Sequence, residues 1–439
     1  MKRRTFRRGI HPPERKATAG KPIEVLPAPE KAYVPFLQHF GKPASPLVKP
    51  GDTVALGQKI GEAAGSFSSS VHSPVSGKVL ALDLHPFPSG APVLTAVIEN
   101  DGRDAPAGEP ERPADPFALS PEAIIQKVGE AGVVGMGGAS FPTAVKLAPP
   151  PQKTIDTVII NGCECEPVQT GDHRLMLESP REILWGAELI RLAARAGRVI
   201  VGVEDNKADA LESLRRSAGG RGVEFALVRT KYPQGAEKML IQALLRREVP
   251  RGGLPFDVGV VVQNVSTAKA VWDAVSRGRP LTERVLTCGG PGIADPKNLL
   301  VRIGTPFRQV IEFCGGLKEG ADLVVYGGPL MGLAQSTLDS PVIKSTTGIL
   351  AFAAGRPETE LACIRCARCV DHCPMGLMPT RLAGLARFDL VAEAEKWGTM
   401  DCIECGCCQY VCPSRIPLLS WIRLGKNRVA ARKSGKGAA

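Results

Sequence analysis

The pattern C-x2-C-x2-C-x3-C-P occurs twice between residues 363 and 413, and no other feature constrains the fold of this chain as strongly. In the bacterial form of this pattern, three closely spaced thiolates bind one [4Fe-4S] cluster and the fourth reaches across to a second cluster. The spacing therefore predicts two [4Fe-4S] clusters. Their expected ligands are Cys363, Cys366, Cys369 and Cys412 for one cluster, and Cys402, Cys405, Cys408 and Cys373 for the other.

Paired structural zinc sites and a disulfide framework are the alternative interpretations. Zinc sites usually combine two pairs of ligands across a long gap, whereas here three thiolates fall within seven residues and a fourth follows four residues later. This spacing favours [4Fe-4S] clusters over zinc sites and disulfides. Cys407 lies between two expected ligands and is interpreted as an additional thiol packed near a cluster. Two neighbouring clusters serve to move single electrons across a protein.

Length and hydropathy exclude some classes of protein. With 439 residues the chain has room for about three domains of ~150 residues each. Its longest apolar runs, such as residues 258–262, have the length of a strand and are too short to span a bilayer. No apolar segment follows the basic start, so we expect no signal peptide. The 13 cysteines then favour a reducing cytosol, in which thiolates act as ligands.

The formal charge is +11 and is concentrated at the two ends of the chain. The basic residues there are Lys2, Arg3, Arg4, Arg7, Arg8, Lys426, Arg428, Arg432, Lys433 and Lys436. Such ends can contact an anionic leaflet or an acidic protein, and a solvated tail is the alternative. Aromatic residues make up only 5% and are not interleaved with the basic ones, which argues against nucleic acid as a partner.

The first domain is expected at residues 1–105 and consists of short strands. Residues 48–61 and 71–80 alternate apolar residues with polar or turn residues, as half-buried strands do. Their sequences resemble those of biotinyl and lipoyl carrier domains, which are small barrel-sandwich structures. A carrier needs a lysine on the loop between the two halves, but residues 62–70 contain none. We therefore expect a carrier-like scaffold without a swinging arm, followed by a linker within residues 101–117.

Alternating strands and helices follow and predict an α/β domain at residues 118–280. Ser120 is a plausible helix N-cap with Pro121 at the first helical position. Expected strands are residues 157–161, 198–203, 223–228 and 258–262, and expected helices include 181–196 and 207–216. Such alternation is typical of a Rossmann-like fold with a largely parallel sheet, whose sites lie at the carboxyl ends of the strands.

A glycine cluster near the start of this domain is the first candidate site. Gly135, Gly137 and Gly138 allow the backbone to approach a ligand closely, and amides that precede a helix can hold a phosphate. The cluster is not the dinucleotide fingerprint, because Ser140 stands where the third glycine would be and no strand precedes it. A tight turn before a helix is the alternative interpretation.

A loop with two carboxylates directly follows the first expected strand of this domain. Glu164 and Glu166 are two residues apart, so on an extended segment they would point the same way. Their mutual repulsion then requires hydrogen-bond donors or cations nearby. Ribose hydroxyls and an isoalloxazine ring offer such donors, and a surface acidic turn is the alternative.

Several motifs, taken together, resemble those of known flavoproteins. The glycine loop with Phe-Pro-Thr and a following Lys, the loop Asn-x-x-Glu-x-Glu-Pro and the later Asn264-Val-Ser-Thr resemble the flavoprotein subunit of respiratory NADH dehydrogenase. The resemblance to the C subunit of the Rnf complex is closer and runs nearly end to end. Its further motifs are Gly9-Ile-His-Pro-Pro, Gln38-His-Phe-Gly-Lys-Pro-Ala, Asp172-His-Arg-Leu-Met, Val203-Glu-Asp-Asn-Lys, Tyr232-Pro-Gln-Gly-Ala-Glu-Lys and Gly327-Gly-Pro-Leu-Met-Gly.

The resemblance implies which residues hold FMN and NADH. The residues that it places around FMN are Gly135, Gly137, Gly138, Lys146, Asn161, Asn264 and Thr267. Phe141 would stack on the nicotinamide nucleotide, and Glu164 and Glu166 would form hydrogen bonds to it. Glu204 and Asp205 would lie close to both ligands.

The resemblance also implies the remaining domains. It predicts a β-grasp ligand-binding module of the SLBB type at residues 281–350, with strands at 284–288, 299–303 and 322–326. A helical ferredoxin-like domain at 355–425 and a basic tail at 426–439 complete the chain. One departure from the family is that Val168 and Gln169 stand where an aromatic and an aliphatic residue are expected.

The function that the resemblance implies is oxidation of NADH at FMN and passage of single electrons through the two clusters. No side chain is needed as a catalytic acid or nucleophile, because hydride transfer occurs at the flavin. The expected partners are ferredoxin, a ferredoxin-like sister subunit and integral membrane subunits that couple electron flow to ion transport. The expected location is the cytoplasmic face of the membrane. A reductase of the cobalamin-reducing kind and an electron carrier without flavin are the competing interpretations.

Overall fold

A parallel four-stranded sheet in order β11-β10-β9-β12 forms the centre of the α/β domain. The strands are β9 (Thr157–Gly162), β10 (Arg198–Glu204), β11 (Val223–Val228) and β12 (Val260–Asn264). Their runs of valine and isoleucine are buried on both faces, as expected for a parallel sheet covered by helices. These strands confirm the predicted alternation. In this computed structural model, the described residues are 3–65, 67–109, 111–220, 222–355 and 359–434.

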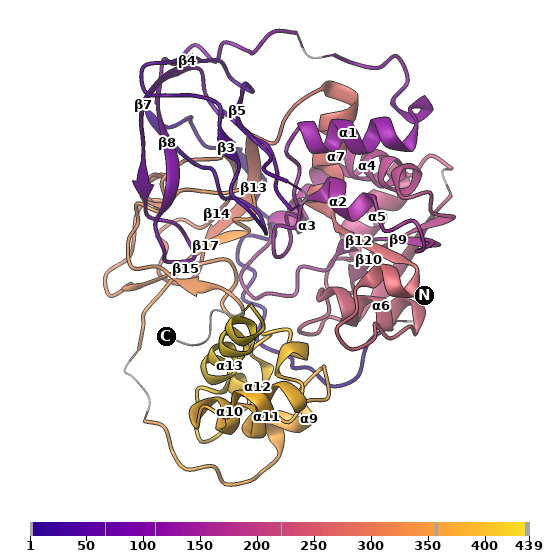
Figure 1. The fold of residues 1–439 in the computed structure, drawn as a ribbon, viewed down its shortest axis with the longest axis vertical. Coiled ribbons are helices and arrows are strands. Elements are labelled where there is room, and N and C mark those ends of the chain that lie inside the picture. Colours follow the sequence, from indigo (N-terminus) through magenta and orange to yellow (C-terminus); the bar gives the residue numbers. More distant parts are fainter. Residues whose placement is uncertain (1–2, 66, 110, 221, 356–358, 435–439) are drawn as a thin grey trace.

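Helices cover both faces of this sheet (Figure 1). They are α1 (Pro121–Glu130), α2 (Thr143–Leu147), α3 (Gly171–Glu178), α4 (Pro180–Ala193), α5 (Ala208–Ser217), α6 (Glu237–Leu245) and α7 (Val265–Arg277), with 3-10 turns η1 (Pro116–Ala118) and η2 (Pro255–Val258). The Ser120 side chain accepts a hydrogen bond from the amide of Ala123 and Pro121 opens α1, which confirms the predicted helix start.

The N-terminal β domain consists of two antiparallel sheets, in orders β2-β8-β7-β4 and β3-β5-β6. Their strands are β2 (Lys31–Pro35), β3 (Ser45–Pro46), β4 (Thr53–Val54), β5 (Lys59–Glu62), β6 (Val71–His72), β7 (Gly77–His85) and β8 (Val93–Asn100). Fully buried Phe36, Ile60 and Ile98 lie in its core. The domain is drawn in indigo in Figure 1.

A mixed six-stranded sheet forms the third unit, in order β1-β14-β13-β17-β15-β16. Its elements are β1 (Ile23–Val25), β13 (Glu283–Gly289), β14 (Lys297–Arg302), β15 (Leu323–Tyr326), β16 (Leu333–Ala334), β17 (Gly348–Phe352) and helix α8 (Phe307–Phe313). The three strands expected here are confirmed. The sheet also recruits β1, from near the start of the chain.

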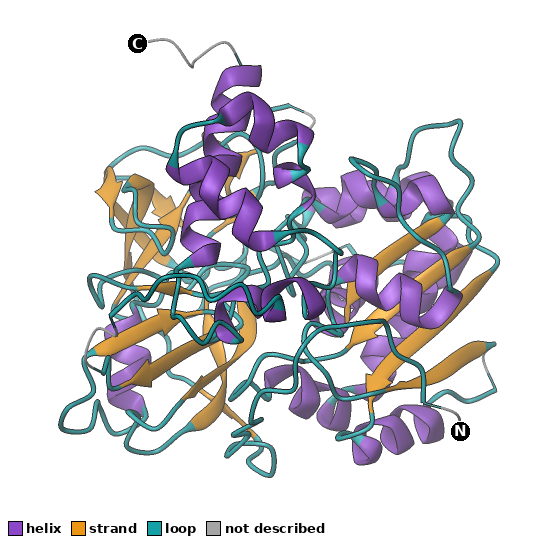
Figure 2. Cartoon of the chain, turned by 90° about the horizontal axis from the view of Figure 1, so that it is seen from below, coloured by secondary structure: helices purple, strands orange, loops and turns teal. Residues whose placement is uncertain are grey.

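The C-terminal unit is helical and carries both cysteine motifs. Its elements are α9 (Arg368–Asp371), α10 (Pro379–Arg387), α11 (Val391–Lys396), η3 (Thr399–Asp401), α12 (Cys407–Tyr410) and α13 (Leu418–Lys433). Figure 2 views the molecule from below and shows these helices lying across the junction of the α/β domain with the β sheets. The cluster motifs therefore face the region where the other units meet.

Residues 3–25, at the start of the unit expected at 1–105, form their strand pairings with other parts of the chain. Arg4 forms a parallel bridge with Val228 at the edge of β11, and the amide of Gly9 donates a hydrogen bond of 3.1 Å to the carbonyl of His372. β1 then pairs in parallel with β14. We name residues 3–25 the strap. The strap pairs with residues that are distant in the sequence, so the local pattern of apolar and polar residues could not predict where it lies.

The end of the chain is not a free tail where it is described. Helix α13 extends to Lys433, so the boundary expected at residue 425 lies inside it. Lys426 forms an ion pair with Glu404 at 2.5 Å, and Lys433 forms one with Glu395 at 2.9 Å. Lys426 and Lys433 therefore connect helix α13 to acidic residues of the helical domain, although the Lys433 side chain is 57% exposed. Lys2 and Lys436 lie outside the described residues.

Candidate functional site

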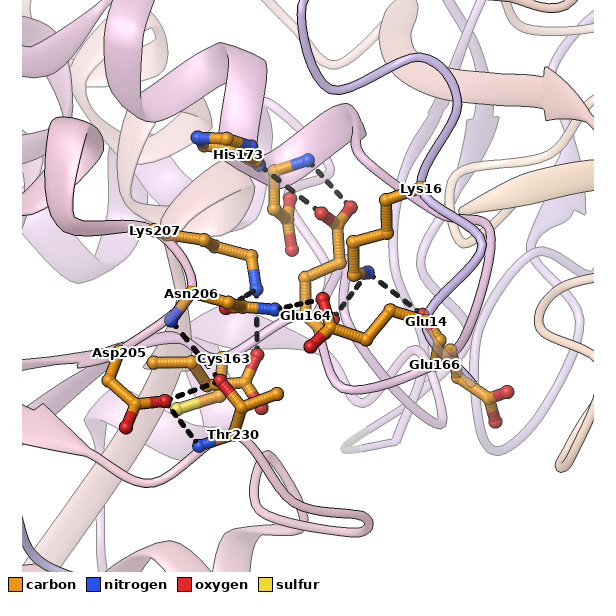
Figure 3. Close-up of polar contacts among 12 residues, drawn as sticks. Glu14, Lys16, Cys163, Glu164, Glu166, His173, Asp205, Asn206, Lys207 and Thr230 are labelled. Atoms are coloured by element: carbon orange, nitrogen blue, oxygen red, sulfur yellow. Dashed lines mark hydrogen bonds and ion pairs between the residues drawn. The ribbon is translucent and has the colours of Figure 1, made fainter. Parts of the chain in front are cut away.

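The loop that follows β9 presents Glu164 to the start of helix α3. The Glu164 carboxylate accepts hydrogen bonds from the amides of Asp172 at 2.9 Å and His173 at 3.4 Å. These amides have no partner within the helix, so the carboxylate caps it. The strap closes the loop from the other side, because the Lys16 amino group donates to the carbonyls of Glu164, Glu166 and Gln169 at 2.9, 3.0 and 2.6 Å (Figure 3).

Glu166 points away from Glu164, so the expectation that both carboxylates point the same way is wrong. Glu166 accepts hydrogen bonds of 2.9 Å from each of the amides of Leu330 and Met331, in the loop before β16. Figure 3 shows the two side chains diverging. β9 ends at Gly162, and the irregular backbone beyond it does not follow the two-residue period of a strand.

Tyr232 connects the Glu166 carboxylate to the cluster motifs. Its hydroxyl donates a 2.8 Å hydrogen bond to the carbonyl of Cys405 and lies 3.5 Å from the Glu166 carboxylate. The Tyr232 side chain is fully buried. A single buried residue therefore touches both the carboxylate loop and a predicted cluster ligand.

The glycine loop lies directly against the start of helix α7. A Cβ on Gly137 would lie 2.6 Å from the side-chain nitrogen Nδ2 of Asn264, whereas a Cβ on Gly138 would meet no atom within 4 Å. The Thr267 hydroxyl accepts a 2.9 Å hydrogen bond from the amide of Met136. Only glycine fits at position 137, and residue 138 leaves open space beside the backbone.

Asn264 and Asn161 hold the neighbouring strand ends in place. Asn264 caps α7 through the amide of Ser266 and donates a 2.7 Å hydrogen bond to Asp172. Asn161, at the adjacent strand end, donates to the carbonyl of Gly235 at 2.8 Å. Three loops predicted to surround one ligand are thus connected by hydrogen bonds.

Lys146 lies on α2, behind the glycine loop. Its amino group forms a 2.5 Å ion pair with Glu237 at the start of α6, and both side chains are partly exposed. The pair links the glycine loop to the segment that follows Tyr232. Gly135 precedes the turn, where its amide donates to the carbonyl of Phe141 at 2.9 Å.

Glu204 and Asp205 follow β10 and point to different surroundings. Glu204 is fully buried and pairs with buried Lys207 at 2.7 Å, while its second carboxylate oxygen has no hydrogen-bond partner among the described residues. Asp205 instead accepts hydrogen bonds from Thr230 and forms a 3.1 Å ion pair with Arg3 of the strap. Glu204 therefore faces the interior, and Asp205 anchors the strap.

A cavity of about 130 Å³ lies beside this buried pair. Its lining includes Lys16, Glu164, Glu204, Asn206 and Tyr232. Burial raises the pKa of both Glu164 and Glu166 to about 7; Lys16 opposes the shift at Glu164, and hydrogen bonds from the amides of Leu330 and Met331 oppose it at Glu166. The free oxygen of Glu204 is an acceptor that a donor group of a bound nucleotide or flavin can satisfy.

The two predicted sets of cluster ligands differ in depth. The inner set, Cys373, Cys402, Cys405 and Cys408, lines one cavity together with apolar residues that include Leu382, Leu419 and Ile422. In the outer set, Cys363 and Cys366 are exposed, Cys412 is half-buried and Cys369 is buried. The inner set is the one that Tyr232 touches.

The cysteine environment fits iron-sulfur clusters. The amides of Leu377 and Glu404 each lie 3.4 Å from a sulfur, on Cys373 and Cys402 respectively, and such hydrogen bonds tune the potential of a cluster. The predicted spacing therefore produces a thiol-lined apolar cavity for the inner set.

Residues that the sequence interpretation missed complete the site. Lys16, Asp172, Lys207 and Tyr232 each lie within the quoted motifs or the strap, but their partners are 3 to 173 residues away. A lysine or tyrosine without local partners carries no pattern that identifies it as buried. Asp172, Lys207 and Tyr232 could have been found because they lie in the quoted motifs, whereas Lys16 could not.

The unfolding free energy is expected to fall as pH rises from about 4.5 to about 7, because burial raises the pKa of Glu164 and Glu166 to about 7. The folded chain then binds more protons than the unfolded chain, and each such carboxylate contributes a slope of at most about 1.4 kcal/mol per pH unit. Urea unfolding between pH 5 and pH 7 measures this slope. Glu164→Gln should reduce the slope of the unfolding free energy against pH. Glu212→Gln, at an exposed site, should leave the slope unchanged. An unchanged slope in Glu164→Gln would contradict the raised pKa of Glu164.

Four known domain families match the chain in order. The RnfC barrel sandwich hybrid domain matches residues 4–103 and the Nuo51 FMN-binding domain matches residues 128–273. The SLBB domain matches residues 281–334 and the 4Fe-4S dicluster domain matches residues 358–413. The predicted fold class and the expected flavin and cluster cofactors are confirmed by these matches.

Relatives of known name match almost the whole chain. It is 45% identical to the C subunit of the proton-translocating ferredoxin:NAD(+) oxidoreductase complex of Clostridium ljungdahlii, over 98% of this chain and 95% of the relative. It is 44% identical to the C subunit of the Na(+)-translocating complex of Acetobacterium woodii, over 99% of each chain. The C subunit of the ion-translocating oxidoreductase complex of Rhodobacter capsulatus is 42% identical, over 98% of this chain and 84% of the relative.

A solved structure shares the fold of most of the chain. It is an NAD+-reducing [NiFe]-hydrogenase in the H2-reduced state, with a TM-score of 0.52 and 20% sequence identity. The match covers 74% of this chain and 63% of that chain, which is less than two thirds of its length. At this identity the likeness shows a common fold.

Proposed function

Because the chain belongs to the family of C subunits of ion-translocating ferredoxin:NAD+ oxidoreductase complexes, we propose that it oxidises NADH at FMN and passes electrons singly through two [4Fe-4S] clusters toward ferredoxin-like partners. FMN accepts electrons as a pair from NADH and releases them one at a time, which suits one-electron clusters. In the complex this transfer is coupled to ion transport and is reversible.

The contact of Tyr232 with both Glu166 and Cys405 carries this proposal. Its hydroxyl lies 2.8 Å from the carbonyl of Cys405 and 3.5 Å from the Glu166 carboxylate. The loops expected to bind FMN and NADH therefore meet the inner cysteine set directly. A flavin-binding domain and a cluster domain with separate roles would not require this buried contact.

We assign the FMN role to the glycine loop and to the strand ends beside it. Gly135, Gly137 and Gly138 provide backbone without side chains, and Asn264 and Thr267 hold that backbone in place. Asn161 and Lys146 fix the two neighbouring loops through Gly235 and Glu237. These seven residues bind and orient the flavin; none of them needs to donate or remove a proton.

We assign NADH to the carboxylate loop. Glu164, Glu166 and Glu204 offer acceptor oxygens to the donor groups of the nucleotide, and Phe141 offers a ring face. The strap, held by Lys16 and Arg3, covers this region and limits the access of water. Asp205 contributes indirectly, by holding the strap.

We propose, from how deeply the two cysteine sets are buried, that electrons reach the inner cluster before the outer one. The inner set touches Tyr232 and is therefore the nearer one to the flavin-binding loops. The outer set includes exposed Cys363 and Cys366 and lies nearest to solvent. Arg365 and Arg368 lie among the outer ligands, where positive charge favours the reduced, more negative cluster.

The chain is one subunit of a multi-subunit complex, and we propose that its neighbours are a ferredoxin-like iron-sulfur subunit and integral membrane subunits on the cytoplasmic face. Within the described part of the chain, no helix combines the length and the apolar character needed to cross a membrane. We propose that the partner subunits and the basic surface attach the chain to the membrane. Co-purification of the chain with membrane-embedded subunits tests this placement.

Anaerobic mixing with NADH tests the function directly. With the full chain loaded with FMN and clusters, NADH is expected to bleach the flavin absorbance and then to produce the EPR signal of reduced clusters. Glu166→Ala and Lys146→Ala should each slow the bleaching at least tenfold, because one removes a nucleotide contact and the other frees the glycine loop from α6. Lys59→Ala, in an exposed pair of the N-terminal domain, is the matched control.

Two outcomes would contradict the proposal. If dithionite reduces the clusters while NADH leaves both flavin and clusters unchanged, NADH is not the donor. If the chain assembles its clusters but retains no flavin in either redox state, it is an electron carrier without flavin.

A further inference from the structure

The strap contacts the helical domain through the motif that begins at Gly9. The amide of Gly9 donates a 3.1 Å hydrogen bond to the carbonyl of His372, which directly precedes the inner ligand Cys373. Gly9 has a φ of +81°, and a Cβ there would lie 2.5 Å from the carbonyl oxygen of Tyr232. Only glycine therefore lets the strap pass at this position. None of the roles proposed above for NADH or FMN uses this motif.

Arg8 places a positive charge beside Cys373. Its Nη1 lies 3.3 Å from the carbonyl of Val370 and 3.5 Å from the carbonyl of Cys373. A Cβ on Gly376 would lie 3.4 Å from the same nitrogen, so the guanidinium covers the turn that follows Cys373. Arg8 is exposed and forms no ion pair with a carboxylate of the described residues. Its charge is therefore not neutralised by the protein.

Ile10 covers a second inner ligand, Cys405. Ile10 and Tyr232 exchange two backbone hydrogen bonds, of 2.8 and 2.9 Å. The Ile10 side chain is 3% exposed and packs in one apolar group with Tyr232, Cys405 and Cys407. An apolar side chain in this place keeps water away from the inner cysteine set.

Positive charge and water change the reduction potential of a cluster in the same direction. Reduction adds one negative charge, so a nearby cation and nearby water both stabilise the reduced form and raise the potential. The exclusion of water lowers it. Arg8 and Ile10 should thus act in opposite directions, although they lie only two positions apart in one segment.

We propose that Arg8 and Ile10 of the strap set the reduction potential of the inner cluster. The inference rests on the proposed function, in which this cluster receives the electrons that leave the flavin. Both are positioning residues, because they act through the surroundings of the cysteines and are not ligands themselves. The strap also holds the carboxylate loop through Lys16, so one segment organises the nucleotide loop and the next electron carrier together.

A redox titration with mediators, followed by EPR, tests the charge on the full chain loaded with FMN and clusters. In Arg8→Gln, the ratio of reduced to oxidised inner cluster at a fixed applied potential is expected to fall about threefold, as suits an exposed charge. The difference from the wild type should shrink between about 50 mM and about 500 mM NaCl. The loss of the inner signal in Cys405→Ser identifies it in the spectrum.

Two further variants serve as controls for Arg8→Gln. Arg8→Lys keeps the positive charge and should retain the potential of the wild type. Arg308→Gln changes the net charge of the chain by the same amount, but it lies in an exposed pair with Asp339 in the unit of the six-stranded sheet. It should leave the inner potential unchanged.

Replacement of Ile10 tests the exclusion of water. In Ile10→Ser, the same ratio is expected to rise about threefold, opposite in sign to Arg8→Gln, because a hydroxyl and water replace apolar atoms. This shift should not depend on salt, since buried sites are screened little. Ile10→Val keeps an apolar side chain and should behave as the wild type. Ile10→Ala, which opens space without adding a polar group, should shift the ratio in the same direction as Ile10→Ser and replaces it if that variant loses its iron.

Shifts of the same sign in Arg8→Gln and Ile10→Ser would overturn the proposal, because they would reflect a general loosening of the strap. An unchanged inner potential in either variant would overturn the role of that residue. Iron content, flavin content and melting temperature show whether each variant is folded. The titration uses chemical reductants and needs no NADH. A wild-type chain whose clusters titrate but are not reduced by NADH would therefore contradict the proposed function alone.

Discussion

Cys405→Ser is expected to leave the flavin reducible by NADH while decreasing electron delivery beyond it at least 100-fold. Cys405 belongs to the inner set, which touches Tyr232 and lines the thiol-rich cavity. Without this ligand the inner cluster should not assemble stably, and electrons then have no carrier next to the flavin loops. Flavin bleaching, cluster EPR and iron content, measured on the same sample, show where the electrons stop.

The outer set is expected to behave differently. In Cys366→Ser, NADH should still produce the EPR signal of the inner cluster, but reduction of an external ferredoxin should be lost. Equal loss of the inner signal in both variants would contradict the order inferred from depth. Cys407→Ala is the matched control, because Cys407 is buried next to Cys405 and is not assigned as a ligand. It should retain the iron content of the wild type.

Lys207→Met is expected to destabilise the α/β domain by about 3–5 kcal/mol, because it removes the ammonium group that pairs directly with the buried Glu204 carboxylate. The two side chains are 1% and 0% exposed and lie 2.7 Å apart. Burial lowers the pKa of Lys207, but the neighbouring Glu204 and Glu164 outweigh this effect and raise it overall. The melting temperature of the chain, followed by circular dichroism, measures the effect.

A double variant separates the unpaired charge from the loss of packing. Glu204→Gln combined with Lys207→Met removes both charges and should recover much of the stability. Arg216→Met is the control, since its pair with Glu212 is exposed and should contribute less than about 1 kcal/mol. If Lys207→Met is no more destabilising than Arg216→Met, the buried pair does not stabilise the fold in the way described.

The buried pair also explains why the site is prepared for a ligand. Lys207 neutralises one oxygen of Glu204, and the other oxygen lacks a partner among the described residues. A buried acceptor without a partner is unfavourable in the free protein and becomes satisfied when a donor binds. If Glu204 binds the nucleotide or flavin as proposed, part of the affinity comes from a group that the fold already holds in place.

Local patterns in the sequence determined the elements and the chemistry of this protein. Cysteines at fixed short spacing predict clusters because one short turn places their sulfurs together. The valine-rich runs predict parallel strands, and Ser120 with Pro121 predicts a helix start, because these depend on neighbouring residues only. The glycine and carboxylate motifs indicated flavin chemistry through their resemblance to a family.

Only the tertiary structure decided which of these residues meet. Glu166 bonds to amides about 165 residues away, Tyr232 reaches Cys405, and the strap joins a sheet formed by residues near position 300. Phe40 and Phe67 belong to one domain and Phe141 to another, so no local pattern predicts that their rings touch. Contacts between distant segments depend on the packing of whole domains, which local sequence periodicity does not encode.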